Sequence, residues 1–209
     1  AVERLLRATL SAARPDDALL GEELGRLGES HRVWILDPID GTAFFCRGDP
    51  NWRVHVALEV AGNTEIAVVT APALGRCWWA TRGGGSFESC WPREKAEARR
   101  LEVSTTSVLR DAVLDALDDE SRARLPPGAG PAAASPLALV ELVRGEIDGF
   151  LAECCHIWDH APWVLLVEEA GGRFTDRMGG HGADQGGGLY SNANLHNQLL
   201  ASLHYPARP

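Results

Sequence analysis

Residues 33–42 read Val33-Trp34-Ile35-Leu36-Asp37-Pro38-Ile39-Asp40-Gly41-Thr42. The short apolar run that stops at Asp-Pro predicts a buried strand followed by a turn. Because proline stiffens the turn, the carboxylates of Asp37 and Asp40 can converge on one point together with the Ile39 carbonyl. Gly41 allows close approach of the backbone, and N–H groups at the start of the next element can hold a phosphate. Taken alone, the same pattern is also a common turn signal.

Two further segments place carboxylates where they would support this turn. Gly21-Glu22-Glu23 follows the first predicted helix, and by itself such a pair usually marks a solvated turn. Trp158-Asp159 opens a long apolar helix, so Asp159 is either the N-cap of that helix or a metal ligand. Carboxylate-only clusters suit hard ions such as Mg²⁺, and no His/Cys spacing typical of zinc competes with them.

Composition excludes several other classes of protein. The net charge of −9 over 209 residues argues against a nucleic-acid surface. The longest apolar stretches, such as residues 161–167, are too short to span a bilayer, and no signal peptide is visible at the start. We therefore expect a cytoplasmic protein with no membrane partner. Five cysteines without a CxxC pair indicate neither a disulfide framework nor a zinc site, and we expect mostly buried, reduced thiols.

Hydrophobic periodicity predicts alternating helices and strands. The predicted helices are residues 2–12, 108–117, 136–144, 158–170 and 194–203; the predicted strands are 33–36, 54–60, 65–70, 76–81, 101–104, 147–152 and 173–176. Residues 92–100 are expected to be exposed, residues 125–131 are the candidate linker, and residues 179–188 form a glycine-rich loop. The successive strands predict an antiparallel meander, and the mixture predicts an α+β fold rather than a doubly wound sheet.

The sequence resembles the inositol monophosphatase-like phosphatases. The residues that carry the resemblance are Gly21-Glu22-Glu23, residues 34–42, Trp158-Asp159-His160-Ala161-Pro162 and residues 168–176, whose order and spacing agree across nearly the whole chain. The resemblance implies an α+β fold, a layered α-β-α-β-α sandwich of the inositol monophosphatase / fructose bisphosphatase type, often as a homodimer. Residues 1–100 would then carry the main metal-binding motif, and residues 101–209 would complete the active site.

The resemblance also implies which residues act. Glu22, Asp37 and the Ile39 carbonyl would hold a first Mg²⁺; Asp37, Asp40 and Asp159 would hold a second; and Glu22 would share a third, weaker ion. Gly41 and Thr42 would bind phosphate through their backbone N–H groups, while the Thr42 hydroxyl helps to orient water. Glu22, Asp40 and Thr42 are thus the implied catalytic residues. The ions would lower the pKa of the water, whose in-line attack releases phosphate and an alcohol.

The substrate is indicated less directly. Residues 70–80 resemble the histidinol-phosphate phosphatases of the family, which serve histidine biosynthesis. A cationic histidinol would suit an acidic pocket, and Glu153 and Asp159 would contact it; the alternative for Glu153 is a surface carboxylate at a strand end. The other hypotheses are an inositol-1-phosphate or broad sugar-phosphate phosphatase, and a metal-binding family member without full activity.

Two departures from the family pattern bear on activity. Phe44 stands where the family usually has Asn, which affects the support of the loop. Relatives also usually carry several dozen residues before the position of Ala1, and part of that segment forms a mobile loop at the third metal. We expect a truncation there to weaken catalysis while sparing the first two metal sites.

Overall fold

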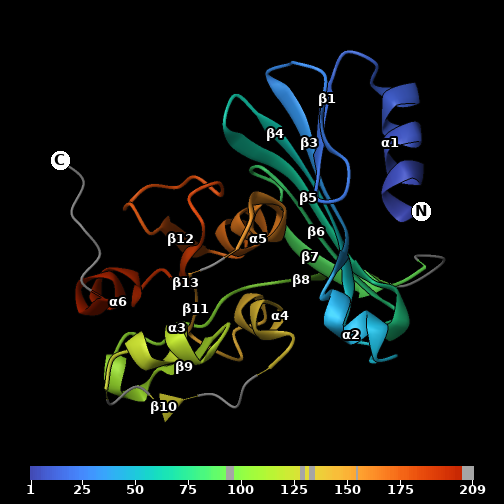
Figure 1. Cartoon of the computed structure of the whole chain (residues 1–209). Helices are drawn as coiled ribbons and strands as arrows, with labels where there is room; N and C mark the ends of the chain where they lie inside the picture. The colour runs from blue at the N-terminus through green and yellow to red at the C-terminus, as the bar shows by residue number, and fades with distance from the viewer. Residues whose placement is uncertain (93–96, 128–129, 132–134, 154, 204–209) are drawn as a thin grey trace.

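The computed structural model describes residues 1–92, 97–127, 130–131, 135–153 and 155–203, which stack as helix, sheet, helix, sheet and helix layers (Figure 1). The helices are α1 (Val2–Ala13), α2 (Thr42–Cys46), α3 (Asp119–Arg124), α4 (Ala138–Val143), α5 (Ile157–Glu169) and α6 (His196–Leu203), with 3-10 turns η1 (Pro72–Leu74) and η2 (Leu109–Asp111). The strands are β1 (Ala18–Gly21), β2 (Gly25–Leu27), β3 (Arg32–Asp40), β4 (Arg53–Val60), β5 (Asn63–Ala71), β6 (Arg76–Thr81), β7 (Gly85–Cys90), β8 (Arg99–Arg100), β9 (Val113–Ala116), β10 (Gly130–Pro131), β11 (Gly149–Ala152), β12 (Gly172–Asp176) and β13 (Gly188–Asn192). The predicted layered α+β fold is confirmed.

The larger sheet has the strand order β2-β1-β3-β4-β5-β6-β7-β8. Strands β3 to β7 pair in sequence and antiparallel. The predicted meander of residues 54–60, 65–70 and 76–81 is confirmed as β4, β5 and β6, and β3 and β7 extend it on either side. Only β1 and β3 run parallel among its pairs in the described residues. The smaller sheet has the order β10-β9-β11-β13-β12, with strands drawn from residues 113–192.

Helix α5 forms the middle layer together with α4 (Figure 1). It packs on β3 to β7 of the larger sheet and on β12 and β13 of the smaller one. A helix that is apolar all round is typical of such a position, and its residues 160–167 are all buried. Gly171, with φ of +88°, follows its end as the glycine pair there predicts. Because α5 packs on both sheets, the division into residues 1–100 and 101–209 stays a prediction.

Two predicted elements are wrong. Residues 101–104 form no strand: the Leu101 N–H donates to the Ser86 carbonyl and the Val103 N–H to the Ala170 carbonyl, so the segment crosses between two elements. Residues 108–117 are not a helix but the η2 turn followed by β9. Strand β9 pairs with both β10 and β11, and such tertiary pairing overrides local helical spacing.

Several other expectations changed. Strands β1, β2, β7, β8 and β13 and helices α2 and α3 were not predicted. Strand β10 lies inside the candidate linker, of which residues 128–129 are outside the described part. Residues 97–100 are exposed as expected, while 93–96 are outside it too. Cys46 and Cys90 are exposed, so the expectation of mostly buried thiols is wrong among the described cysteines. No helix in the described residues is long and apolar enough to cross a membrane.

Candidate metal centre and substrate pocket

A β-bulge brings the two aspartates of the Asp-Pro-Ile-Asp turn to one side of the larger sheet. In the pairing of β3 with β4, Asp37 lies opposite His55 and Asp40 opposite Arg53, so three steps along β3 match two steps along β4. Positions 37 and 40 would face opposite ways in a regular strand, and the extra residue removes that difference. Pro38 is tolerated within the strand because bulges leave an unpaired position.

Hydrogen bonds within the turn fix its shape. The Ile39 N–H donates to Asp37 Oδ1 at 2.9 Å, and the Thr42 hydroxyl donates to the Ile39 carbonyl at 3.0 Å. Gly41 is the N-cap of α2 with φ of +75°, and a Cβ there would meet the Phe44 ring at 3.0 Å. Glycine is therefore required at this position for both its conformation and its size. The N–H groups at the start of α2 have no partner within the helix, as the predicted phosphate contact by Gly41 and Thr42 needs.

Four carboxylates from three parts of the chain converge here. Burial, together with the charges of Asp40, Glu22 and Asp159, raises the pKa of Asp37 to about 9. Burial also raises the pKa of Asp159 to about 6 against the lowering effect of the hydrogen bond from the His156 N–H, and the charges of Asp40 and Glu22 add smaller increases. Like charges crowded in a low dielectric are stabilised by a bound cation. The donor set therefore fits a hard divalent ion such as Mg²⁺.

Asp159 does not cap its helix. The N-cap of α5 is His156, and Asp159, in the first turn, accepts the His156 N–H at 2.7 Å as half of a capping box. Of the two alternatives for Asp159, the N-cap is thus wrong. The capping bond holds the carboxylate toward Asp37 and Asp40, and its role as a metal and substrate ligand stays a prediction.

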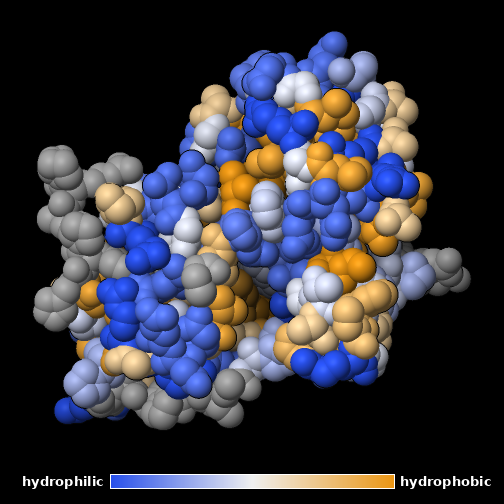
Figure 2. All heavy atoms as spheres, in the orientation of Figure 1, coloured by the Kyte–Doolittle hydropathy of each residue, from blue (hydrophilic) through white to orange (hydrophobic). Residues whose placement is uncertain are grey.

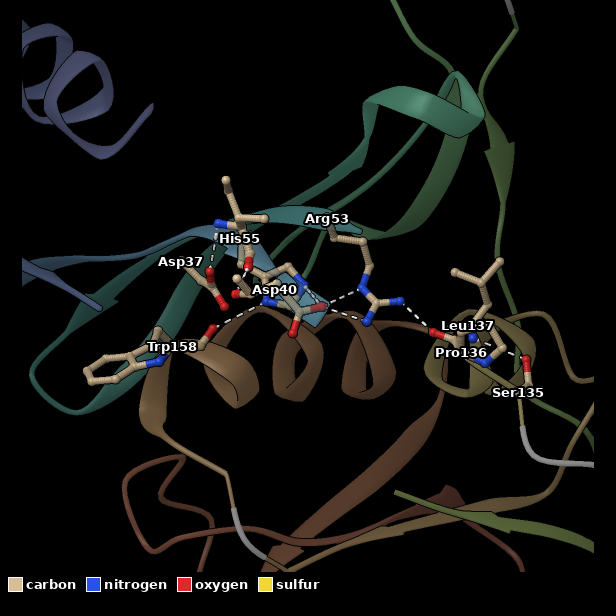
Figure 3. Close-up of polar contacts among 10 residues, drawn as sticks. Asp37, Asp40, Arg53, His55, Ser135, Pro136, Leu137 and Trp158 are labelled. Carbon is tan, nitrogen blue, oxygen red and sulfur yellow. Dashed lines mark hydrogen bonds and ion pairs between the residues drawn. The ribbon is translucent and has the colours of Figure 1, made fainter. Parts of the chain in front are cut away.

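Arg53 and His55 complete the site, and sequence reasoning missed both (Figure 3). Arg53 Nε and Nη2 each lie 2.6 Å from Asp40 Oδ2, and Nη1 donates to the Pro136 carbonyl at 2.5 Å. A ligand atom of His55 lies within 4.8 Å of one from each of Asp37 and Asp40, a group that could hold a metal ion. The available signal was a charged residue and a histidine at alternate positions of an apolar strand, which places both on one face.

The electrostatics of Asp40 differ from those of the other acids. Burial favours its neutral form, but the charges of His55 and Arg53 and the Arg53 hydrogen bond bring its pKa below the ordinary value. Burial lowers the pKa of His55 to about 4, so that ring is neutral near neutral pH. Arg53 is accordingly the positive charge that keeps Asp40 ionised.

A pocket of about 610 Å³ opens beside the carboxylates. Asp40, Arg53, His55 and Asp159 line it, and most of the other lining residues are apolar, including Leu137 before α4, Val140 in α4, Phe150 in β11 and Trp163 in α5. Figure 2 shows the surface hollowed between the two halves of the molecule, with apolar side chains in the hollow. A concave apolar site with a few polar groups at one end suits a small molecule with one charged group. Phe44, the departure from the family's Asn, also lines it.

Glu153 is not among the residues that line this pocket, although its neighbour Ala152 is. It directly follows β11, is 9% exposed, and forms an ion pair with Arg124. Its carbonyl accepts a hydrogen bond from Arg177. It is therefore a buried carboxylate at a strand end rather than a surface one, and its role in substrate binding stays a prediction.

The fold and the carboxylate centre are those of the metal-dependent phosphomonoesterases. The model of the Inositol monophosphatase family matches residues 1–206, and the chain belongs to that family, which uses divalent metals and acts on phosphate esters.

Relatives cover most of the chain. It is 41% identical to a glucose-1-phosphate thymidylyltransferase of Streptomyces griseus over 88% of this chain and 73% of the relative. It is 38% identical to a histidinol-phosphatase of Mycobacterium tuberculosis over 98% of this chain and 82% of the relative. It is 36% identical to an inositol-1-monophosphatase of Rhizobium meliloti over 85% of this chain and 70% of the relative. Among solved structures, the extragenic suppressor protein suhB of Bartonella henselae superposes with a TM-score of 0.78 at 29% identity, covering 96% of this chain and 85% of that one.

Proposed function

We propose that the protein hydrolyses histidinol phosphate to histidinol and phosphate with Mg²⁺ as the cofactor. The observation that carries the proposal is a group of interacting carboxylates, Glu22, Asp37, Asp40 and Asp159, two of which, Asp40 and Asp159, line an apolar pocket. The carboxylates suit both a divalent ion and, beyond it, the cationic side of an aminoalcohol. Relatives from two actinobacteria that carry the name histidinol-phosphatase add support at 35% and 38% identity.

The ligand roles in this proposal are those that the family resemblance implies. Glu22, Asp37 and the Ile39 carbonyl would hold one Mg²⁺, and Asp37, Asp40 and Asp159 would face a second position. When bound, such ions supply charge neutralisation and lower the pKa of the attacking water. Asp37 has one carboxylate oxygen on the Ile39 N–H, which orients the other for this role.

Thr42 and Gly41 handle water and phosphate. The Thr42 hydroxyl donates its hydrogen bond to the Ile39 carbonyl. Its oxygen lone pairs are therefore available to accept a hydrogen bond from the water. The water is then oriented for in-line attack. The N–H groups of Gly41 and Thr42, at the start of α2, bind the phosphate oxygens.

The alcohol specificity has a second candidate. The similarity to an inositol-1-monophosphatase supports a different substrate for this chain, inositol-1-phosphate or sugar phosphates more broadly. The name of the Streptomyces griseus relative describes nucleotidyl transfer, a different reaction, so names alone do not decide the substrate. The ion pair between Arg53 and Asp40 favours a third possibility, a metal-binding member with weakened activity.

Phosphate release distinguishes these hypotheses. The protein is incubated with histidinol phosphate, inositol-1-phosphate or fructose bisphosphate at equal concentration, with Mg²⁺ and with a chelator. We expect the largest kcat/KM for histidinol phosphate and no release with the chelator. A larger value for another ester contradicts the substrate, and no Mg²⁺-dependent release from any of them contradicts the activity.

Assembly as a homodimer and location in the cytoplasm complete the proposal. Light scattering of the purified protein tests the first, and fractionation of the source cells tests the second.

A further inference from the structure

The Arg53 guanidinium is fixed from two sides. Two of its N–H groups point to the same oxygen of Asp40, and a third donates to the Pro136 carbonyl just before α4 (Figure 3). Only 13% of the side chain is exposed. Because its planar guanidinium is held by Asp40 on one side and by the Pro136 carbonyl on the other, Arg53 has a fixed position beside Asp40 and is not a mobile surface charge.

This contact removes a ligand atom from the second metal position. Asp40 Oδ2 carries both Arg53 contacts, and His55 Nε2 lies 3.5 Å from the same oxygen. A divalent ion at that oxygen would have to displace charge-assisted hydrogen bonds and sit beside a permanent positive charge. The positive charge of Arg53 therefore opposes the binding of a second cation beside Asp40.

The remaining acids are placed differently. Among the described residues, the Asp37 and Asp159 carboxylates accept hydrogen bonds from backbone N–H groups, those of Ile39 and His156. A backbone N–H bond orients a carboxylate without placing a full positive charge beside it, so these two acids differ from Asp40 in the charge of their partner.

We propose that Arg53 takes the place of one of the two divalent ions, so that the centre binds a single ion at Glu22 and Asp37 while Arg53 serves as the fixed cation on Asp40. The inference rests on the proposed function, because it concerns the ions of that same site. The arginine charge neither dissociates nor depends on metal supply. We therefore expect the second ion to bind at least about tenfold more weakly than it does without Arg53, which corresponds to about 1.4 kcal/mol.

Mn²⁺ binding to the intact chain tests the number of ions directly. Isothermal titration gives the stoichiometry, and electron paramagnetic resonance separates an isolated Mn²⁺ from a spin-coupled pair. We expect one ion per chain and an isolated signal. Two ions of similar affinity, or a coupled signal, would overturn the inference without any variant.

The Arg53→Met variant keeps much of the side-chain volume and removes the charge. We expect it to bind a second Mn²⁺ at least about tenfold more tightly than the wild type and to show the coupled signal. Arg53→Lys keeps the charge and should stay with one ion. The matched control is Arg144→Gln, which removes the positive charge paired with another buried carboxylate, Glu88, outside the site. This change should leave the number of bound ions unchanged. A second-ion affinity in Arg53→Met within twofold of the wild type would overturn the inference.

Failure of this inference is distinguishable from failure of the proposed function. A wild-type chain that binds two ions and releases phosphate overturns only the role of Arg53. A chain that binds no Mn²⁺ or Mg²⁺ overturns both. One bound ion without phosphate release supports the role of Arg53 and contradicts the activity.

Discussion

His55 Nδ1 lies 3.3 Å from the carbonyl oxygen of Trp158, the residue next to Asp159 in the first turn of α5. The same ring meets Trp163 edge to face, with centroids 6.0 Å apart. The His55 ring thus connects β4, the strand paired with the one that carries Asp37 and Asp40, to α5, the helix that carries Asp159. Its other nitrogen, Nε2, is buried and has no hydrogen-bond partner among the described residues.

Replacing His55 tests this connection. We expect His55→Ala to lower the free energy of unfolding by about 2–4 kcal/mol, because it leaves a cavity beside Trp163 and an unpaired carbonyl. Urea unfolding measures the loss. His31, whose side chain is exposed, is the control, and His31→Ala should change stability by no more than about 0.5 kcal/mol. A loss below about 1 kcal/mol for His55→Ala would contradict the role of the ring.

Asp40→Asn removes the carboxylate that Arg53 binds. We expect phosphate release to fall by at least about 100-fold, because the negative charge at the centre is lost. We also expect a loss of stability of about 1–3 kcal/mol, because the Arg53 charge keeps only weaker partners. Asp111→Asn, at an exposed carboxylate of η2, is the control for both measurements. Turnover within tenfold of the wild type would argue against the assigned role.

Two glycines of positive φ separate backbone strain from steric fit. Gly41 has φ of +75° and Gly48 has φ of +71°, but only at Gly41 would a Cβ meet a neighbour, the Phe44 ring at 3.0 Å. We expect Gly48→Ala to cost about 1 kcal/mol and to leave kcat unchanged. Gly41→Ala should cost more and should lower kcat, because the turn that carries Asp40 and Thr42 must shift. Equal effects of the two changes on kcat would refute this account.

The buried His196 makes stability depend on pH. Its Nδ1 lies 2.7 Å from the Ser191 hydroxyl and its Nε2 2.8 Å from the Thr175 hydroxyl, and burial, with Arg173 and His181, lowers its pKa to about 4. The unfolded chain takes up this proton near pH 6.5, so it binds more protons than the folded one between about pH 6.5 and 4. Stability from this group is therefore complete above that range and is lost as the pH falls through it, by about 3 kcal/mol.

Urea unfolding at pH 7.5 and pH 4 measures the effect of His196. We expect the loss of stability between the two pH values to be smaller in His196→Gln than in the wild type by about 3 kcal/mol. The exposed His31 again serves as the control through His31→Gln. The same pH dependence in His196→Gln and the wild type would refute the assignment.

The sequence predicted the elements whose signals are local. Strand β3, the meander that follows it and helix α5 are marked by apolar runs and by glycine or proline at their ends. Strand β9 was mistaken for a helix because its neighbours β10 and β11 come later in the chain, and only their pairing makes it a strand.

The candidate site divides in the same way. The family pattern identified the acids, but not that a bulge sets Asp37 and Asp40 on one face, which depends on register with β4. Arg53 and His55 were missed because the sequence of an apolar strand does not show which residues its polar side chains will contact. Their role depends on the distances to Asp40, which folding alone brings about.

The pocket draws much of its apolar wall from a different part of the molecule than its acids, and this has an evolutionary consequence. The acids belong to the larger sheet and to the start of α5, whereas Val140 and Phe150 belong to α4 and β11 and Leu137 directly precedes α4. Substitutions in the apolar wall can therefore change which alcohol fits while the hydrolytic groups stay under separate selection. Enzymes with this arrangement can therefore keep one reaction while their substrate specificity changes, because a substitution in the apolar wall does not require a compensating change among the acids.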